Sequence, residues 1–234
     1  HVSIYKGLPY VELRVSLNWN EQHKMLKLSF TVNVDQPVLT SSIPYGWAKR
    51  PCNGEEEPMH KWVDMAGRIM SVNGETKDYG LSICNDCKYS YDAKGSETRI
   101  TVLRSPPYAH HQPYKLDPSQ TYSYIDQGWQ DFNLMLIPHA GSWKPAYTIR
   151  RAEELNSKPI VFVDYPHKGT LPPCCSLTQV NQDSVIVSVL KKHEDSGNLV
   201  MRLYETNGEE TEAVINLPFI GKRFKARFKP FEIK

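Results

Sequence analysis

The sequence predicts an all-β protein, and three observations support this. Apolar and polar residues alternate along several segments, as they do in strands with one buried and one solvated face. Helical periodicity is confined to one short segment, residues 149–155, which is long enough for one or two turns. The 17 prolines and 13 glycines are spread through the connections instead of gathering in one linker. This pattern is typical of antiparallel sheets joined by turns.

The first two strands are predicted at residues 11–18 and 26–34. In the first, one face is apolar and consists of Val11, Leu13, Val15 and Leu17. In the second, the apolar face consists of Leu26, Leu28, Phe30, Val32 and Val34. Because only the polar segment "NEQHK" separates the two strands, we expect them to form an antiparallel hairpin that is buried on one side.

Later segments continue the alternation. The segment "TRITVL" (98–103) is a predicted strand, and residues 199–203 and 213–217 are two more. Asn207 and Gly208 lie between the last two. This pair favours a two-residue hairpin turn because both positions need positive φ. The sequence therefore predicts a second hairpin here.

Charge patterning gives no sign of a nucleic-acid or membrane partner. The 28 basic and 26 acidic residues leave a net charge of +2. No apolar run approaches the roughly 18 residues of a membrane span. The one basic cluster lies in residues 222–229, where charged and apolar residues alternate with period two. We interpret it as a strand with its charged face in water.

The cysteines do not form a recognisable metal or redox motif. Five is an odd number for a disulfide framework. Cys84 and Cys87 form a C-x-x-C, but a thioredoxin-type motif needs a helix start, and "CNDCKYSYD" is typical of a strand that turns back on itself. A zinc site would need a second C-x-x-C or an H-x-x-x-H nearby. We therefore expect reduced thiols in a cytoplasmic protein.

Two long motifs carry a family resemblance. "IPYGWAKRPCNGEEEPMHKWVDM" (43–65) and "YGLSICNDCKYSYDAKGSETRITVLRSPPY" (79–108) resemble the C-terminal region of family 38 glycoside hydrolases, the retaining α-mannosidases. Residues 185–217 and the final "PFEIK" resemble the small terminal β-sandwich of the same family. The resemblance implies a large antiparallel supersandwich at 1–170, followed by a small C-terminal β-sandwich at 171–234.

The resemblance also implies a division of labour. In that family the catalytic machinery lies upstream, so this chain is expected to support a catalytic domain and to line its substrate cleft. No catalytic residue or metal ligand is expected in this chain, which should be inactive alone. Zinc and the aspartate nucleophile are expected in the N-terminal catalytic domain. The expected partners are that domain and a mannose-containing oligosaccharide, and a homo-oligomer is also considered. The alternatives are a freestanding carbohydrate-binding module and a purely structural or oligomerisation domain.

Two segments contain the candidate binding residues. "RPCNGEEEPMHKW" includes Asn53 and three consecutive glutamates, and retaining glycosidases use two carboxylates about 5 Å apart. Neighbouring side chains of an extended backbone point to opposite faces, so a solvated acidic loop is the favoured interpretation. "NDCKYSYD" offers Asp86, Lys88 and Tyr89, whose charged groups suit sugar hydroxyls and whose ring suits a sugar face. A hairpin with an ordinary surface salt bridge is the equal alternative.

Other aromatic and histidine residues favour structural roles. Tyr108, Tyr114 and Trp143 are candidates for a carbohydrate platform, but a core or an interface is the favoured use of such residues in a β-sandwich. His139, in "PHAGSW", matches a family motif. We expect it to be a hydrogen-bonded structural histidine.

Overall fold

The computed structural model describes residues 1–70, 73–108, 115–170 and 172–234. It confirms the all-β class, because these residues form sixteen strands, one α-helix and one 3-10 turn. They divide into two compact units, the first with residues 1–43 and 47–156 and the second with residues 44–46 and 157–234. The predicted division into 1–170 and 171–234 stays a prediction, and residue 171 lies outside the described residues.

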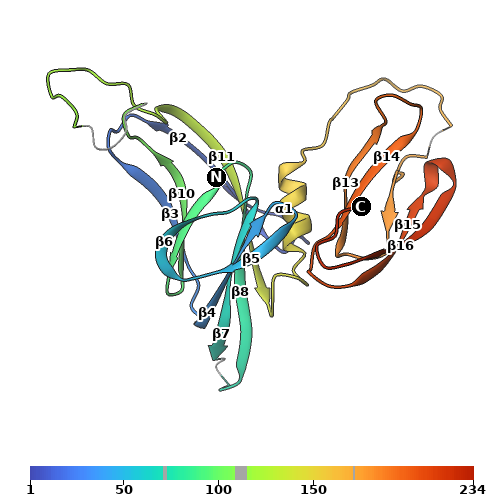
Figure 1. The fold of residues 1–234 in the computed structure, drawn as a ribbon, viewed down its shortest axis with the longest axis horizontal. Coiled ribbons are helices and arrows are strands. Elements are labelled where there is room, and N and C mark those ends of the chain that lie inside the picture. Colours follow the sequence, from blue (N-terminus) through green and yellow to red (C-terminus); the bar gives the residue numbers. More distant parts are fainter. Residues whose placement is uncertain (71–72, 109–114, 171) are drawn as a thin grey trace. The chain divides into compact units, whose positions relative to one another are not determined.

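The first unit is built on two antiparallel sheets (Figure 1). The larger sheet has seven strands in the order β1-β2-β11-β8-β7-β4-β5. Its strands are β1 (Val2–Ile4), β2 (Val11–Trp19), β4 (Asp35–Ile43), β5 (Gly46–Arg50), β7 (Trp62–Met70), β8 (Thr76–Asn85) and β11 (Gly128–Ala140). The smaller sheet has the order β3-β10-β9-β6. Its strands are β3 (Met25–Thr31), β6 (Asn53–Pro58), β9 (Ser90–Lys94) and β10 (Glu97–Arg104).

The main core lies between these two sheets. Val63 of β7 and Ile83 of β8 pack in one buried cluster with Tyr91 of β9 and Ile100 of β10. A second cluster joins Phe132 and Leu134 of β11 to Val102 and Leu103 of β10. The strands that contribute to these clusters turn alternate residues toward this interior.

The other face of the seven-stranded sheet is covered by α1 (Thr148–Asn156) and the segment before it. Trp62, Cys84 and Met135 of the sheet pack there with Trp143 and Ala152. These sheet residues directly precede or follow the ones that face the main core, so β7, β8 and β11 are apolar on both faces. The helix predicted at 149–155 is confirmed and extends one residue further at each end.

The predicted hairpin of residues 11–18 and 26–34 is wrong. β2 pairs with β1 and β11, whereas β3 pairs with β10 in the other sheet. Both strands turn their apolar residues toward the same interior cluster, from opposite sheets. Alternation predicts which face of a strand is buried, but not which strand is its neighbour. Two strands in opposite sheets that face one core have the same alternation as two paired strands of a hairpin.

The second unit contains a three-stranded and a two-stranded sheet. The first has the order β12-β15-β16 and the second joins β13 to β14. The strands are β12 (Gln179–Val180), β13 (Val185–Lys192), β14 (Leu199–Glu205), β15 (Thr211–Leu217) and β16 (Lys222–Phe228), with the 3-10 turn η1 at Pro218–Ile220. Val185 and Leu203 of one sheet are buried with Ala213, Ile215 and Phe228 of the other.

The predicted hairpin around Asn207 and Gly208 is also wrong. β14 and β15 lie in different sheets, so this turn carries the chain across the unit. Gly208 has the expected positive φ of 74°, whereas Asn207 is not among the residues with positive φ. The buried carboxylate of Glu205 accepts hydrogen bonds from the amides of Asn207 at 2.7 Å and Gly208 at 2.8 Å. A buried side chain therefore shapes this turn.

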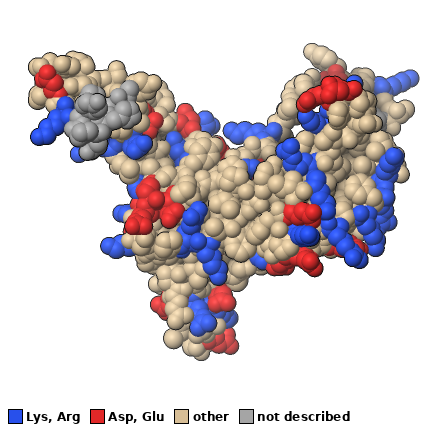
Figure 2. Space-filling model, in the orientation of Figure 1, with Lys and Arg blue, Asp and Glu red and all other residues tan. Residues whose placement is uncertain are grey.

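The basic segment is a strand, as predicted. β16 pairs with β15, and Lys225 and Arg227 lie 3.2 and 3.0 Å from the carboxylate of Glu212. Phe228 is buried on the opposite face. On the face drawn in Figure 2, basic atoms lie beside acidic atoms over this unit. The charged face of β16 is thus solvated and partly paired within its own sheet.

Candidate functional site

The segment with three of the four predicted binding residues is a short turn, Asp86–Tyr89. It does not return the chain along β8, as a hairpin would, but passes from β8 in one sheet to β9 in the other. Asn85 is buried and secures the start of the turn, because its side-chain oxygen accepts the Lys88 amide at 2.8 Å. The carbonyl of Asn85 accepts the side-chain amide of Asn156, at the end of α1, at 2.9 Å.

Asp86 and Lys88 both attach this turn to β11. The Asp86 carboxylate accepts hydrogen bonds from the backbone amide of Asn133 at 3.0 Å and from its side-chain amide at 2.7 Å. The Lys88 ammonium lies 3.5 Å from the Gln130 side-chain oxygen and 4.9 Å from the centre of the Phe132 ring. Because residues 130 and 132 face one side of β11 and residue 133 the other, the two charged groups do not converge on one point.

Tyr89 is one of two exposed residues in the turn, and the other is Cys87. Tyr89 is 55% exposed, while its backbone oxygen accepts the Met59 amide at 3.0 Å. The turn thus holds its backbone in place and leaves the ring in solvent. An exposed aromatic ring on a fixed backbone is suited to contact with the apolar face of a sugar.

Asn53 does not join this group. It opens β6 opposite Lys94, whereas the Asp86–Tyr89 turn leads into Ser90, opposite Pro58 at the other end of β6. Four residue steps along β9, from Ser90 to Lys94, therefore separate the two places by about 13 Å. Asn53 instead bonds Glu55, with 2.8 Å between its side-chain nitrogen and the Glu55 carboxylate.

The three consecutive glutamates have three different partners. Glu55 bonds Asn53, Glu57 lies 3.4 Å from the Arg50 guanidinium, and Glu56 pairs with Lys27 of β3. They do not form a pair of converging carboxylates, in agreement with the alternation argument. Glu56 also accepts hydrogen bonds from Ser90 and Thr101, so it lies at the centre of a network across the four-stranded sheet.

Asp92 is the buried member of this network. It pairs with Lys27 and accepts a hydrogen bond from Nε of Arg99 at 2.7 Å. Burial alone would raise the pKa of Asp92, but the hydrogen bonds from Arg99 and Lys27 outweigh it and hold the pKa below its ordinary value. The network links all four strands of the sheet and is structural.

A second buried network lies beneath α1, and the sequence predicted only one of its members. His139 bonds Asp64 with 2.8 Å between Nε2 and the carboxylate, which confirms the structural role expected for this histidine. The Ser82 hydroxyl donates to the same carboxylate oxygen at 2.6 Å and lies 2.7 Å from the Thr148 hydroxyl, at the start of α1. Because Ser82 bonds the aspartate and not the histidine, the arrangement is not a nucleophile with its base.

A cavity of about 190 Å³ opens beside this network. Its walls combine the indoles of Trp47 and Trp143 with the buried Asp64. The Lys144 ammonium also lines it, 5.9 Å from the centre of each of these two rings. The remaining wall residues are Val38, Thr40, Lys49, Ala66 and Ser142. Two aromatic walls with a few polar groups are typical of a small-molecule site. Trp143 itself is buried, as the core interpretation predicted, whereas Tyr108 is exposed and Tyr114 lies outside the described residues.

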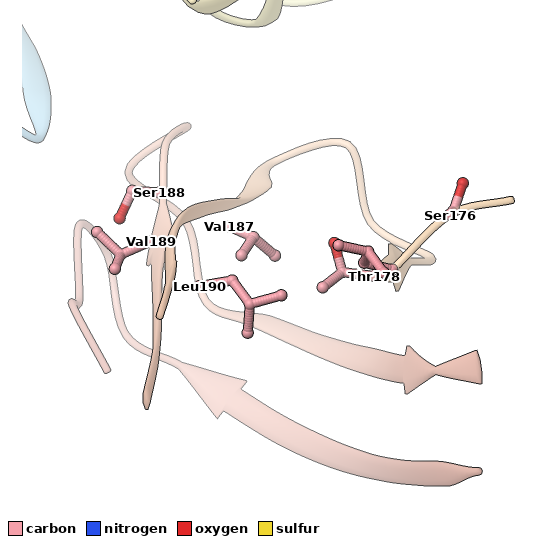
Figure 3. Close-up of a pocket in the computed structure, with 7 residues that line it drawn as sticks. Ser176, Thr178, Val187, Ser188, Val189 and Leu190 are labelled. Carbon is pink, nitrogen blue, oxygen red and sulfur yellow. The ribbon is translucent and has the colours of Figure 1, made fainter. Parts of the chain in front are cut away.

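A larger, shallower hollow lies in the second unit. It measures about 430 Å³ and runs between residues 176–178 and residues 187–190 of β13. Figure 3 shows Val187, Leu190 and Thr178 around its middle. Only aliphatic and hydroxyl-bearing side chains line it. It therefore offers neither an acid or base nor a charged group to orient a substrate.

Among the described residues, the cysteines form no disulfide, and the cysteine, histidine and acidic side chains form no metal site. All five cysteines are free thiols, and burial raises the pKa of Cys84. Within the residues described, no three His, Cys, Asp or Glu side chains gather where they could hold a metal ion. None of the helices described is long and apolar enough to cross a membrane.

Two segments of the chain match models of one protein family. Residues 1–112 match the glycosyl hydrolases family 38 C-terminal domain, and residues 184–227 match the glycosyl hydrolases family 38 C-terminal beta sandwich domain. The chain belongs to the C-terminal region of glycosyl hydrolase family 38. Apart from residues 44–46, the first match falls in the first structural unit, and the second match falls in the second unit.

Individual relatives of this family 38 region are named α-mannosidases. Alpha-mannosidase 2C1 of Mus musculus is 27% identical over 262 residues, which cover 97% of this chain and 23% of the relative. Alpha-mannosidase G of Dictyostelium discoideum is 27% identical over 89% of this chain and 19% of its own length. The chain thus spans about a fifth of the curated relatives it matches.

A solved structure shows the same fold. The crystal structure of an alpha-mannosidase from Enterococcus faecalis V583 superposes with a TM-score of 0.80 at 15% identity. The match covers 99% of this chain and 28% of that one. At this identity the likeness establishes the fold of the family 38 region and nothing further.

Proposed function

We propose that this chain is the accessory β region of an α-mannosidase that hydrolyses terminal α-mannosides with retention of configuration. The observation that supports it most is the pair of family 38 matches, in the same order as the two structural units. The chain spans 19–23% of its α-mannosidase relatives, so the activity is assigned to the whole protein and not to this region. Its own part is to pack against the catalytic domain and to line the substrate cleft.

The turn Asp86–Tyr89 is the part of this region that we assign to the cleft. Asp86 and Lys88 are already bound to Asn133 and Gln130, so their role is to fix the turn. Tyr89 is left with an exposed ring that can stack on a mannose unit. Asn53, about 13 Å away along the sheet, would reach only a further unit of the oligosaccharide.

The test is a pair of substitutions in the longer protein from the same gene. Tyr89→Ala should lower kcat/KM for a mannose-containing oligosaccharide about fivefold, because an aromatic contact with substrate is worth roughly 1 kcal/mol. Tyr5→Ala removes a comparably exposed tyrosine from the segment after β1 and serves as the control. Equal kcat/KM for both variants and the unaltered enzyme would favour the purely structural alternative.

Three further expectations belong to this proposal. Zinc, which the family resemblance implies, would be held by the catalytic domain and would contact substrate hydroxyls there. The partner of this region is that domain, in a monomer or a homo-oligomer. A cytoplasmic location is supported by the five free thiols, because an oxidising compartment favours disulfides.

A second candidate function is carbohydrate binding by this chain alone, and the cavity beside Asp64 favours it. Its volume, two indole walls and Lys144 suit a single sugar ring. Titration with methyl α-mannoside should then shift the indole NMR signals of Trp47 and Trp143, and Lys144→Ala should weaken the effect. Unchanged spectra at tens of millimolar sugar would remove this candidate and leave the accessory role untouched.

A further inference from the structure

The segment that follows α1 exposes an unusual run of apolar side chains. Ile160, Val161, Phe162, Val163 and Tyr165 are between 80% and 98% exposed. Residues 157–170 belong to no helix or strand. Single exposed apolar residues are ordinary, but a contiguous run of this size marks an interaction site. Flexible linkers are instead rich in glycine, serine or charged residues.

The sequence of this run is that of a strand buried on both faces. In extended backbone, Ile160 and Phe162 point to one side, and Val161, Val163 and Tyr165 point to the other. The second side is therefore wholly apolar, and the first is apolar apart from Asp164, whose carboxylate lies 3.0 Å from Nε2 of His167. Runs with apolar residues on both sides are typical of strands that lie between two covering layers. β-branched and aromatic residues are also the types enriched in strands.

Two prolines set the limits of the run. Pro159 precedes it and Pro166 follows it, and neither can donate a hydrogen bond to a neighbouring strand. Six residues with backbone amides lie between them, the usual length of a strand. Asp164 is the one charged residue among the six.

We propose that residues 160–165 form a β-strand that adds to a sheet edge of the catalytic portion of the same protein, with both apolar faces covered there. This inference rests on the proposed function, which supplies that portion. The relatives are four to five times as long as this chain, since it spans 19–23% of them. In the α-mannosidase with the same fold, the region that superposes on 99% of this chain makes up 28% of that protein. A large protein surface is therefore expected beside this region.

The segment has a second property that fits such an anchor. It lies at the start of the second structural unit, shortly after the first unit ends at Asn156. Main-chain pairing supplies affinity along an added strand, and the side chains supply specificity through the pockets they fill. A docked strand at this junction would hold the C-terminal region on the catalytic portion at the point where its two units meet in sequence.

The test is amide hydrogen exchange of residues 160–165, measured in this chain and in the longer protein from the same gene. We expect exchange near the unprotected rate in the isolated chain and at least 100-fold slower exchange in the longer protein. Unprotected exchange in the longer protein would overturn the inference. Protection in the isolated chain would also overturn it, because the strand would then pair with a second copy if protection rose with concentration, or with its own chain if it did not.

A substitution gives an independent result. In the longer protein, Phe162→Ser should speed exchange across 160–165 at least tenfold, because it removes the largest side chain from one face. Met70→Ser, which alters an exposed apolar residue at the end of β7, should leave that exchange unchanged. Equal exchange in Phe162→Ser and the unaltered protein would contradict burial of this face.

Mannosidase activity distinguishes this inference from the proposed function. If the longer protein is active but residues 160–165 are unprotected, the proposed function stands and the docking strand is wrong. If residues 160–165 are protected in the longer protein but it releases no mannose, the docking strand stands and the proposed function is wrong.

Discussion

At the scale of single residues, charged side chains on the smaller sheet are bound mainly to one another. Lys27 contacts both Glu56 and Asp92, although 29 and 65 residues separate them in the sequence. Three adjacent glutamates suggested a possible acidic site, but only the fold reveals that each has a different partner. The sequence correctly indicated that adjacent side chains would diverge. It could not identify Lys27, because that pairing depends on which strands become neighbours.

The Asp92 pair makes stability depend on pH in a defined direction. The folded-state pKa of Asp92 is lowered, so its stabilising contribution is complete above about pH 5 and is lost as the pH falls through the folded value. We expect Asp92→Asn to lose about 1–3 kcal/mol at pH 7 and to show a shallower loss of stability between pH 5 and 3. Urea unfolding across this range measures both effects.

Asp131→Asn is the matched control for this experiment. Asp131 is exposed and lies 3.9 Å from Arg14, and such surface pairs contribute about 0–1 kcal/mol. If Asp131→Asn cost as much as Asp92→Asn, the buried network would not be the source of the pH dependence.

Gly80 gives a second residue-scale prediction. A Cβ atom at this position would lie 2.5 Å from Cε1 of His139 and 2.9 Å from the Ala66 Cβ. Gly80→Ala should therefore destabilise the protein by about 1–3 kcal/mol, because the histidine is held by Asp64 and cannot move freely. Gly197→Ala, with no atom within 4 Å of the added carbon, should stay within about 0.5 kcal/mol. Chemical denaturation measures the free energy of unfolding of both variants. Similar losses of stability in the two would contradict the tight contact at Gly80.

At the scale of elements, sequence patterns located strands better than they located partners. The alternation at residues 11–18 and 26–34 located β2 and β3, although β3 ends at Thr31 and not at residue 34, yet the two belong to different sheets. The same happened to β14 and β15, where the Glu205 carboxylate and not a two-residue hairpin sets the turn. Strand pairing depends on distant segments, as in the pairing of β2 with β11. The alternation within one segment does not indicate which distant segment becomes its neighbour.

The layer under α1 provides the element-scale prediction. Trp143 packs against Trp47 and Trp62, with ring centres 5.5 and 4.9 Å apart. Trp143→Ala should cost about 3–5 kcal/mol and reduce the near-ultraviolet circular dichroism, because a large cavity would open between sheet and helix. Trp129→Ala, which removes a tryptophan that is 72% exposed, should cost far less. A small loss of stability in Trp143→Ala would show that this layer contributes little to the fold.

At the scale of the whole molecule, the two long motifs predicted the family correctly, and both structural units match it. Substrate binding by the four candidate residues stays a prediction, and the fold shows only where each of them lies. Asp86, Lys88 and Tyr89 share one turn because they are neighbours in sequence, whereas Asn53 lies at the far end of β6. The cavity between Trp47 and Trp143 was not predicted, since its walls come from segments about 100 residues apart.

The central claim is that this region assists an α-mannosidase but does not cleave the glycosidic bond itself. The most direct test is release of product from a chromogenic α-mannoside, with and without added zinc, by the purified 234-residue chain and by the longer protein from the same gene. We predict no release above background from the chain under either condition and sustained release from the longer protein. Sustained hydrolysis by the chain alone, or none by a folded longer protein, would contradict the account.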